Sequence, residues 1–402
     1  MPAALVITAA TFGIVGVLTG TYWLMVFGRM QRIARFTPRL AEGLAENSSQ
    51  GRVSVVVPAH DEVRVIGRLV RTVLEQRDVD LELIIVLDRC TDGTADAIRE
   101  AAAGDPRVRT LEIQECPEDW AGKCHAAERG AEIATGDWIL FTDADVGFDP
   151  KALQAATSDA AAHDLDLLSA WTSLTAERWW EKVVQPAAAI TLLRIYPPDR
   201  VNNDERPRSF ANGQFMLFSR ETYERIGRHA AVRERLLEDL AFAELVHAHG
   251  GRVRVVSAGP MVRTDMYSSL GSMLLGWRRI LMEASKRNPR RVVTNAVLVF
   301  GSGLAPLLCW GGIVAGSFLM GFGIDPPLGL AAIITSAFGL LSQGFTLCWI
   351  FRSGRMPLVG VLGWAVGCAM VSATLLAASR DLGARRPVRW GGREYILEST
   401  TN

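Results

Sequence analysis

Three groups of acidic side chains stand directly after short apolar runs of the chain. They are Asp61 with Glu62, then Asp88, then Asp143 with Asp145. In an extended segment the residue between Asp143 and Asp145 points away, so both carboxylates can face one ion. Carboxylate oxygens are ligands that suit Mg²⁺ or Mn²⁺ bridging a diphosphate. The spacing therefore predicts a divalent metal site at Asp143 and Asp145.

Two further positions are suited to act on a phosphate or on a proton. Lys123 follows Gly122 at the start of a helical pattern, where its ammonium and the backbone amides can reach a phosphate, unless it is an ordinary surface lysine. Asp239 follows Glu238 at the start of another apolar-periodic helix. We interpret Asp239 as the general base and Glu238 as the second candidate; the alternative is a carboxylate that only interacts with the helix dipole.

The elements that must position these residues form a regular alternation. Helical patterns separate most of five short apolar runs of strand length, which are Val53 to Val57, Leu81 to Leu87, Val108 to Ile113, Trp138 to Thr142 and Leu165 to Ala170. This alternation predicts an α/β domain with a mainly parallel sheet between helices. Such sheets bind ligands beyond the carboxyl ends of their strands, which is where the acidic groups stand.

Long apolar stretches flank this domain. Ala3 to Phe27 carries no charge and is long enough to cross a hydrocarbon core of about 30 Å. It is longer than the apolar part of a signal peptide, and its arginines follow it, so a transmembrane helix is favoured over a signal peptide. Three more runs are Val292 to Gly323, Leu328 to Phe351 and Pro357 to Ser379. Basic residues follow the first run and precede the second, which predicts a cytoplasmic middle region.

The C-terminal runs leave one conflict open. Four crossings would place the basic tail outside, against the charge rule. Either one terminal run is re-entrant, or the run from Val292 is broken near Pro306 or at Gly311 and Gly312, or the tail does not obey the rule; we favour a cytoplasmic tail. The segment from Glu177 to Tyr196 is either an interfacial helix or a buried core helix.

These patterns divide the chain into six parts. We expect a transmembrane helix at 1–28, a basic linker at 29–50, the α/β domain at 51–264, an interfacial helix at 265–291, a transmembrane region of about three apolar segments at 292–380 and a basic tail at 381–402. Basic and acidic residues balance at 43 each, which gives no reason to expect a nucleic-acid partner. The six cysteines form no CxxC pair, which disfavours a zinc site and a disulfide framework.

From Val53 to Arg279 these residues resemble the family 2 glycosyltransferases of the GT-A fold. The shared features are a PAxNE-like first strand end, a DGT turn and a DxD motif. The resemblance implies a nucleotide-sugar donor, with a UDP-sugar as the commonest choice in the family, and Mg²⁺ or Mn²⁺ as cofactor. The implied donor-binding residues are Pro58, Asp61, Glu62, Asp88, Lys123 and Asp143. The family usually has Asn where Asp61 stands, and often has a second Asp in place of Leu87.

Other segments resemble the integral-membrane, lipid-modifying branch. Trp120 to Ala126 looks like its GWxGKxxA stretch, and Glu238-Asp239 resembles the ED motif whose aspartate is the catalytic base. The tail from Trp390 to Tyr395 resembles the WxGRxY motif of ceramide-glucosyltransferase-like and hopanoid-associated bacterial enzymes. The segment Gly276-Trp277-Arg278-Arg279 resembles the GW-basic element of carotenoid-type and hopanoid-associated enzymes, although an interfacial anchor near the membrane would look the same. By this resemblance, residues that touch the acceptor or the diphosphate are Asn212, Gly213, Trp277, Arg278 and Arg279.

Together these features predict an inverting, metal-dependent transfer of a single sugar from a nucleotide-sugar to a hydroxyl of a membrane lipid or lipid-like acceptor. The expected location is the bacterial inner membrane, with the catalytic domain in the cytoplasm. One alternative is a polyprenyl-phosphate glycosyltransferase, which would share every residue named above. A second is a catalytically silent membrane scaffold or transport partner that keeps a GT-A shell.

Overall fold

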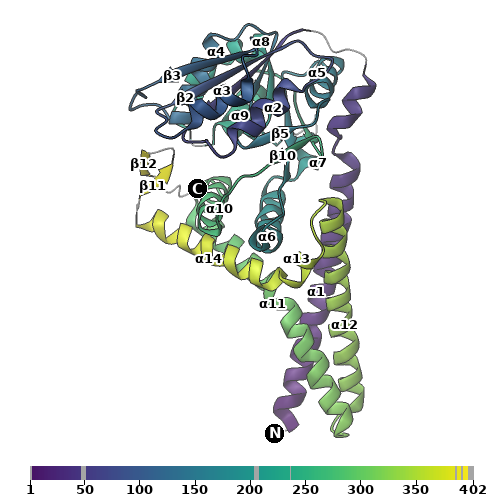
Figure 1. The fold of residues 1–402 in the computed structure, drawn as a ribbon. Coiled ribbons are helices and arrows are strands. Elements are labelled where there is room, and N and C mark those ends of the chain that lie inside the picture. Colours follow the sequence, from purple (N-terminus) through teal and green to yellow (C-terminus); the bar gives the residue numbers. More distant parts are fainter. Residues whose placement is uncertain are drawn as a thin grey trace.

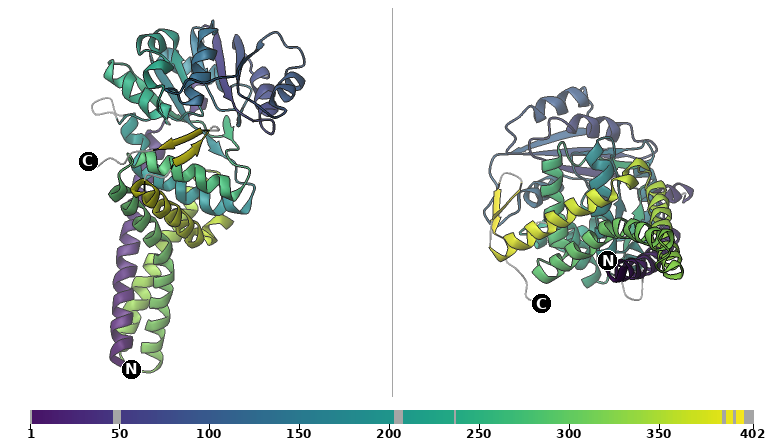
Figure 2. Two further views of the ribbon diagram at one scale, coloured as in Figure 1. Left: turned by 90° about the vertical axis from the view of Figure 1, so that its left-hand side faces the viewer. Right: turned by 90° about the horizontal axis from the view of Figure 1, so that it is seen from below.

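The protein consists of a globular α/β part at one end of a long helical stalk (Figure 1). The computed structural model describes residues 2–46, 51–202, 208–235, 237–384, 387–390 and 393–396. A layer of helices lies between the globular part and the stalk. The first described residues lie at the far end of the stalk, and the last described ones, in β12, lie near the α/β part (Figures 1 and 2).

A seven-stranded sheet forms the centre of the α/β part, in the order β3-β2-β1-β4-β8-β6-β9. Its strands are β1 (Val53–Ala59), β2 (Leu81–Asp88), β3 (Val108–Ile113), β4 (Trp138–Phe141), β6 (Leu167–Trp171), β8 (Met216–Ser219) and β9 (Val253–Ser257). Among these strands β8 alone is antiparallel to its neighbours, so the predicted mainly parallel sheet is confirmed. A small second sheet joins β5 (Val146–Phe148), β7 (Ser173–Leu174) and β10 (Val262–Thr264).

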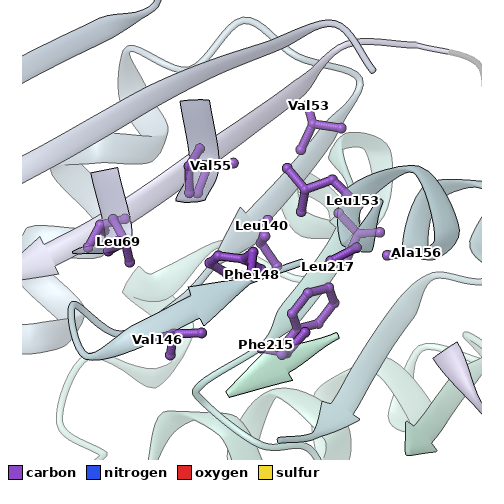
Figure 3. Close-up of a cluster of buried hydrophobic side chains, with 14 of the residues drawn as sticks. Val53, Val55, Leu69, Leu140, Val146, Phe148, Leu153, Ala156, Phe215 and Leu217 are labelled. Atoms are coloured by element: carbon purple, nitrogen blue, oxygen red, sulfur yellow. The ribbon is translucent and has the colours of Figure 1, made fainter. Parts of the chain in front are cut away.

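Helices cover both faces of the central sheet because its buried side chains alternate. Val55 and Leu140 face one side, where they pack with side chains of α2 (Ile66–Leu74) and α5 (Ala152–Ala162), as Figure 3 shows. Val56 faces the other side, against two further helices. These are α4 (Gly122–Glu132) and α9 (Glu238–Ala248). The shorter peripheral elements are η1 (Leu40–Ala45), α3 (Thr94–Ala102), α7 (Pro198–Val201), α8 (Arg220–Arg225) and η2 (His229–Val232).

The direction of β8 decides which segments meet at the edge of the sheet where the parallel strands have their carboxyl ends. Strands β1, β2, β4 and β6 are parallel, so their carboxyl ends lie at one edge. Because β8 runs the opposite way between β4 and β6, its amino end lies at that same edge. The turn with Asn212 and Gly213, which precedes β8, therefore stands beside the acidic residues that follow the parallel strands.

Three long helices form the stalk, where they pack along one another (Figures 1 and 2). They are α1 (Pro2–Phe36), α11 (Pro289–Gly321) and α12 (Pro326–Ser353). A Cβ atom on Gly339 would lie 2.8 Å from the Gly16 carbonyl oxygen, so glycine lets α1 and α12 approach closely. Helix α11 runs unbroken through Pro306, so the proposed break in this run is not present.

The last apolar run does not continue the stalk. It is divided into α13 (Val359–Leu362) and α14 (Trp364–Gly383), and α14 lies crosswise beneath α6 (Trp179–Ile195) and α10 (Leu270–Ala284) (Figures 1 and 2). Within the described part of the chain, four helices, α1, α11, α12 and α14, are long and apolar enough to cross a membrane. The number of crossings and the side on which the tail lies stay predictions.

A short hairpin ends the described chain. Strand β11 (Pro387–Trp390) pairs antiparallel with β12 (Arg393–Ile396). The two glycines of the WxGRxY-like motif, Gly391 and Gly392, lie outside the described residues.

Candidate functional site

Lys123 lies at the centre of the charged site. Its Nζ is 2.7 Å from Asp143 Oδ1 and 2.7 Å from Glu238 Oε1. Burial by itself lowers the pKa of Lys123, but the carboxylates of Asp143 and Glu238 outweigh it, so the pKa rises and the side chain is a cation. Lys123 thereby links the start of α4 to the end of β4 and the start of α9.

The start of α4 also packs closely on the end of β2. Asp88 is buried, and both of its carboxylate oxygens accept hydrogen bonds from the Arg89 guanidinium at 2.7 and 2.8 Å. A Cβ atom on Gly122 would lie 3.0 Å from Asp88 Oδ2 and 2.9 Å from Arg89 Nη2. A larger residue at position 122 would therefore have to displace the Arg89 guanidinium or the Asp88 carboxylate. The predicted donor-binding Asp88 lies at the rim of the sheet, held by its neighbour.

Asp61 and Glu62 follow β1, whose penultimate residue is Pro58. Asp61 has a φ of 56°, and its carboxylate accepts hydrogen bonds from the backbone of Thr91 at 2.7 Å and of Asp92 at 3.3 Å. It therefore ties the turn after β2 to the end of β1. An Asn at this position could accept the same bonds, since Asn also tolerates this backbone conformation.

The carboxylate of Glu62 is close to the acidic residues that follow β4. Burial, followed by the charges of Asp143 and Asp92, raises the pKa of Glu62 to about 7. Burial and then Asp143 and Glu62 also raise the pKa of Asp145 well above its usual range. The carboxyl groups of Glu62, Asp143 and Asp145, which come from the two loops after β1 and β4, thus repel one another.

The residues at this place fit a divalent cation bound together with a diphosphate. Asp145 Oδ1 is buried, and among the described residues it has no hydrogen-bond partner. Among the described residues, no group of three or more His, Cys, Asp or Glu side chains is arranged so that it could hold a metal ion by itself. Mg²⁺ commonly takes one or two carboxylates and completes its shell with substrate phosphates and water. Asp143 and Asp145 match such an incomplete protein site.

Asp239 faces the turn before β8. Its Oδ2 accepts a hydrogen bond from the Gly213 amide at 2.9 Å, and its Oδ1 accepts one from the Leu240 amide at 2.8 Å. Burial, and then the charge of Glu238, raise the pKa of Asp239 to about 7, although Lys123 and both amides oppose the shift. A buried carboxyl that titrates near neutrality is suited to accept a proton.

The turn at Asn212 and Gly213 is held against these acids by its own contacts. The Asn212 side-chain amide donates to the Ala170 carbonyl at 2.9 Å, which fixes the turn to the end of β6. A Cβ atom on Gly213 would lie 3.1 Å from Lys123 Nζ and 3.4 Å from Asp239 Oδ2. Any side chain at Gly213 would therefore crowd the centre of the site.

A cavity of about 670 Å³ extends from this site towards the stalk. At its charged end it is lined by Lys123, Asp143, Glu238 and Asp239. Its far walls are mostly apolar and come from helices that are far apart in the sequence. From α1, α6 and α12 these side chains are Met30, Ile33, Ala34, Ala189, Leu192, Leu193, Trp349 and Ile350. The cavity thus joins the acidic rim of the sheet to the stalk.

Two tryptophans line this cavity between its charged end and its apolar end. Trp277 is 4% exposed, and its Nε1 has no hydrogen-bond partner among the described residues. The same holds for Nε1 of Trp171, whose ring stacks on Phe210 at 4.6 Å. No motif predicts a role for Trp171, although it stands directly after the predicted strand Leu165 to Ala170, in the position that the acidic residues hold after theirs.

Arg279 lines the cavity, whereas Arg278 is not among its described lining residues, and contact of either arginine with a diphosphate stays a prediction. Arg278 forms an ion pair with Asp381 and donates to the Ala377 carbonyl at 3.2 Å, so it fastens α10 to α14. Successive residues of an α-helix point about 100° apart, so neighbouring arginines face different surroundings.

Comparison with known proteins is consistent with the sequence resemblance. Residues 54–227 match the model of glycosyl transferase family 2. The glycosyltransferase AglD of Haloferax volcanii is 30% identical over 180 residues, which is 43% of this chain and 27% of that protein. The 4,4'-diaponeurosporenoate glycosyltransferase of Staphylococcus haemolyticus is 31% identical over 101 residues, or 25% of this chain and 26% of that protein. The chain thus spans about a quarter of each of these relatives.

Among solved structures, a mannosyltransferase from Pyrobaculum calidifontis in complex with GDP-Man and Mn²⁺ is similar at 18% identity, with a TM-score of 0.48. The superposition covers 94% of this chain and 98% of that one.

Proposed function

We propose that the protein transfers a single sugar from a nucleotide-sugar to a hydroxyl of a membrane lipid, with inversion at the anomeric carbon. The match of residues 54–227 to the model of glycosyl transferase family 2 supports glycosyl transfer. The observation that carries the proposal is the cavity of about 670 Å³, which has Asp239 at one end and the apolar side chains of Ile33 and Ile350 at the other. An acceptor with an apolar tail and a polar head fits such a cavity along its length.

Asp239 is the proposed catalytic base. The acceptor hydroxyl gives its proton to the Asp239 carboxylate as its oxygen bonds to the anomeric carbon, and the bond from that carbon to the donor diphosphate breaks. Gly213 and Leu240 orient both carboxylate oxygens. One displacement inverts the configuration, and the chain's own residues need form no covalent bond to the sugar.

The donor is proposed to lie across the ends of β1, β2 and β4. Pro58, Asp61, Glu62 and Asp88 stand on the nucleoside side, and a UDP-sugar is the donor we expect. Lys123 would contact the diphosphate. Asp143 and Asp145 would hold Mg²⁺ or Mn²⁺, which would supply positive charge to the departing diphosphate.

The membrane arrangement is part of the proposal. Helices α1, α11 and α12 are proposed to cross the bacterial inner membrane, with the α/β part in the cytoplasm and α14 along its surface. Ile324→Cys at the far end of the stalk should react with an impermeant thiol reagent in spheroplasts of a chain otherwise free of cysteine. Arg64→Cys should react only after lysis; the reverse pattern would overturn the orientation.

The direct test of function uses detergent-purified protein with a panel of nucleotide-sugars and Mg²⁺ or Mn²⁺. Nucleotide release should rise when a lipid extract of the host is added, and the sugar should appear on a lipid. Release without lipid stimulation would contradict the lipid acceptor. Absence of release with every donor would support a silent scaffold. Transfer to an added polyprenyl phosphate that survives Asp239→Asn would support the polyprenyl-phosphate alternative.

A blocking variant tests the route of the acceptor. Ala189 lines the cavity on α6, so Ala189→Trp should fill part of it and reduce transfer to lipid at least tenfold while donor binding remains. Val297→Trp is the matched control, because Val297 is 62% exposed on the stalk and lines neither this cavity nor the smaller one described below. Equal transfer by both variants would show that the acceptor enters elsewhere.

A further inference from the structure

A second, smaller cavity of about 220 Å³ lies where the stalk meets the crosswise helices. Its walls come from α1, α6, α11 and α14, and Trp23 and Trp364 meet edge to face at one wall with ring centroids 5.9 Å apart. It opens towards the side of the stalk, since Met25, Tyr22 and Leu298 line it and are 63%, 42% and 47% exposed. On the proposed membrane arrangement this opening faces lipid.

Two arginines, Arg29 and Arg194, line the same cavity, and no acidic residue is among its described lining residues. Neither arginine takes part in an ion pair within the described part of the chain; Arg194 donates a hydrogen bond to Asn295 Oδ1 at 2.6 Å. Burial lowers the pKa of Arg194, as expected for a guanidinium that no carboxylate faces. The cavity therefore offers two positive charges to a ligand that brings negative charge.

The depth of Arg29 points to the part of a lipid that it would meet. The uncharged run of α1 ends at Phe27, and Arg29 is the first charged residue after it. On α1, Tyr22, Met25 and Arg29 are spaced at three and four residues, so they lie along one face of the helix. An acyl chain can therefore follow Tyr22 and Met25 while its phosphate lies at the level of Arg29.

Helix α6 separates this cavity from the acceptor cavity. Ala187, Ile190 and Arg194 line the small cavity, whereas Ala189 and Leu193 line the large one. Met30 lines both. A ligand in the small cavity would therefore support the helix that forms one wall of the acceptor cavity.

We propose that the small cavity is a binding site for an anionic phospholipid, distinct from the acceptor, whose phosphate lies between Arg29 and Arg194. The inference rests on the membrane location proposed above. It does not require glycosyl transfer, so a direct lipid-binding measurement tests it separately from the catalytic proposal. Bound lipid should hold α6 in place, so anionic lipid should also raise the thermal stability of the full chain.

The test places the full chain in nanodiscs of phosphatidylcholine with 0 to 30 mol% phosphatidylglycerol. Lipid retained after release into the gas phase is counted by native mass spectrometry, and the unfolding temperature is measured in the same nanodiscs. The wild type should retain one phosphatidylglycerol in preference to phosphatidylcholine. The preference should fall about fivefold in Arg29→Leu and in Arg194→Leu, and further in the double variant.

Arg32→Leu is the matched control, because Arg32 is exposed on the same helix and does not line the cavity. Arg194→Leu also loses the hydrogen bond to Asn295, so its effect could reflect misfolding. Arg29→Leu loses no such bond and therefore tests the site independently of that effect. Loss of preference in Arg32→Leu equal to that in Arg29→Leu would overturn the site, since it would reveal only general attraction to the anionic surface. A wild type that shows no preference for phosphatidylglycerol would overturn it as well.

Discussion

The ammonium of Lys123 lies 2.7 Å from Glu238 Oε1, and the two side chains are 20% and 4% exposed. Glu238 is the first residue of α9, and Lys123 is the second residue of α4. Their ion pair thus joins two helices that meet the sheet from different parts of the sequence, directly beside Asp239.

We expect Lys123→Met to lower the free energy of unfolding by about 3 kcal/mol, because it leaves the buried Glu238 carboxylate without its cation. Adding Glu238→Gln should recover part of that loss, since the double variant no longer buries an unpaired Glu238 carboxylate, whereas Asp143, which is 31% exposed, still lacks its cation. Denaturant unfolding in detergent of the two single variants and the double variant measures the interaction. A double variant less stable than Lys123→Met would contradict this explanation.

Asp239→Asn should reduce transfer by about 10² to 10⁴-fold while donor affinity is kept, because the amide removes the proton acceptor and keeps the shape. The rate of transfer and the donor dissociation constant should be measured on one preparation. Glu244→Gln is the control on the same helix, since Glu244 is exposed. Near-normal transfer by Asp239→Asn would move the base to Glu238.

The rate at saturating substrates should rise with pH. Asp239 has a pKa of about 7, and only its ionised form accepts a proton, so the rate should increase about tenfold from pH 6 to pH 8. Glu238 and Lys123 are the charged groups that shift it. Glu62 has the same pKa, so Glu62→Gln is the comparison. The increase should persist in Glu62→Gln and disappear in Asp239→Asn; the opposite result would assign it to Glu62.

Removing divalent metal should abolish tight donor binding, and adding Mg²⁺ or Mn²⁺ should restore it. Asp145→Ala should raise the metal concentration needed for donor binding at least tenfold, because it removes a buried oxygen that has no other described partner. Donor binding in titrations of metal measures both effects. Asp164→Asn, at an exposed carboxylate outside the site, should behave as the wild type. Unchanged donor binding in excess chelator would refute the metal site.

Trp277→Phe should raise the KM for the lipid acceptor about fivefold and leave donor affinity unchanged, because it removes one hydrogen-bond donor from the acceptor cavity and keeps an aromatic ring. Steady-state transfer at varied acceptor concentration measures this. Trp349→Phe, nearer the stalk in the same cavity, serves as comparison. A change in donor affinity instead would place the Trp277 indole at the donor.

Much of the α/β part could be predicted because its signals are local. The runs that end near Ala59, Asp88 and Phe141 have strand length and alternate with helical patterns, and the acidic residues follow them directly. Parallel strands bring their carboxyl ends together, so three acidic groups could be expected at one edge without knowing any contact. Lys123 and Asp239 were proposed from helix starts and short motifs, which are also local.

The remaining features depend on pairings that no local pattern contains. The bond between Gly213 and Asp239 exists because β8 is reversed between two parallel strands, and its sequence does not encode that order. The acceptor cavity needs α1 and α12, which stand at opposite ends of the chain. Helix α14 has a mean hydropathy of 1.2 in its most apolar window, enough for a membrane-crossing candidate, yet packing against α6 and α10 turns it crosswise.

The length of α1 determines how far the acceptor cavity lies from the hydrocarbon core of the membrane. At 1.5 Å per residue its 35 residues extend about 52 Å, whereas a hydrocarbon core is about 30 Å thick. Ile33 and Ala34, which line the acceptor cavity, stand roughly 9 Å beyond the end of the uncharged run at Phe27. On the proposed membrane arrangement, an acceptor whose hydroxyl sits at the edge of the hydrocarbon would fall short of Asp239. The apolar side chains on the protruding turns of α1 would therefore hold the tail of the acceptor beyond the edge of the hydrocarbon, so a lipid has to be drawn partly out of the membrane before its hydroxyl reaches Asp239.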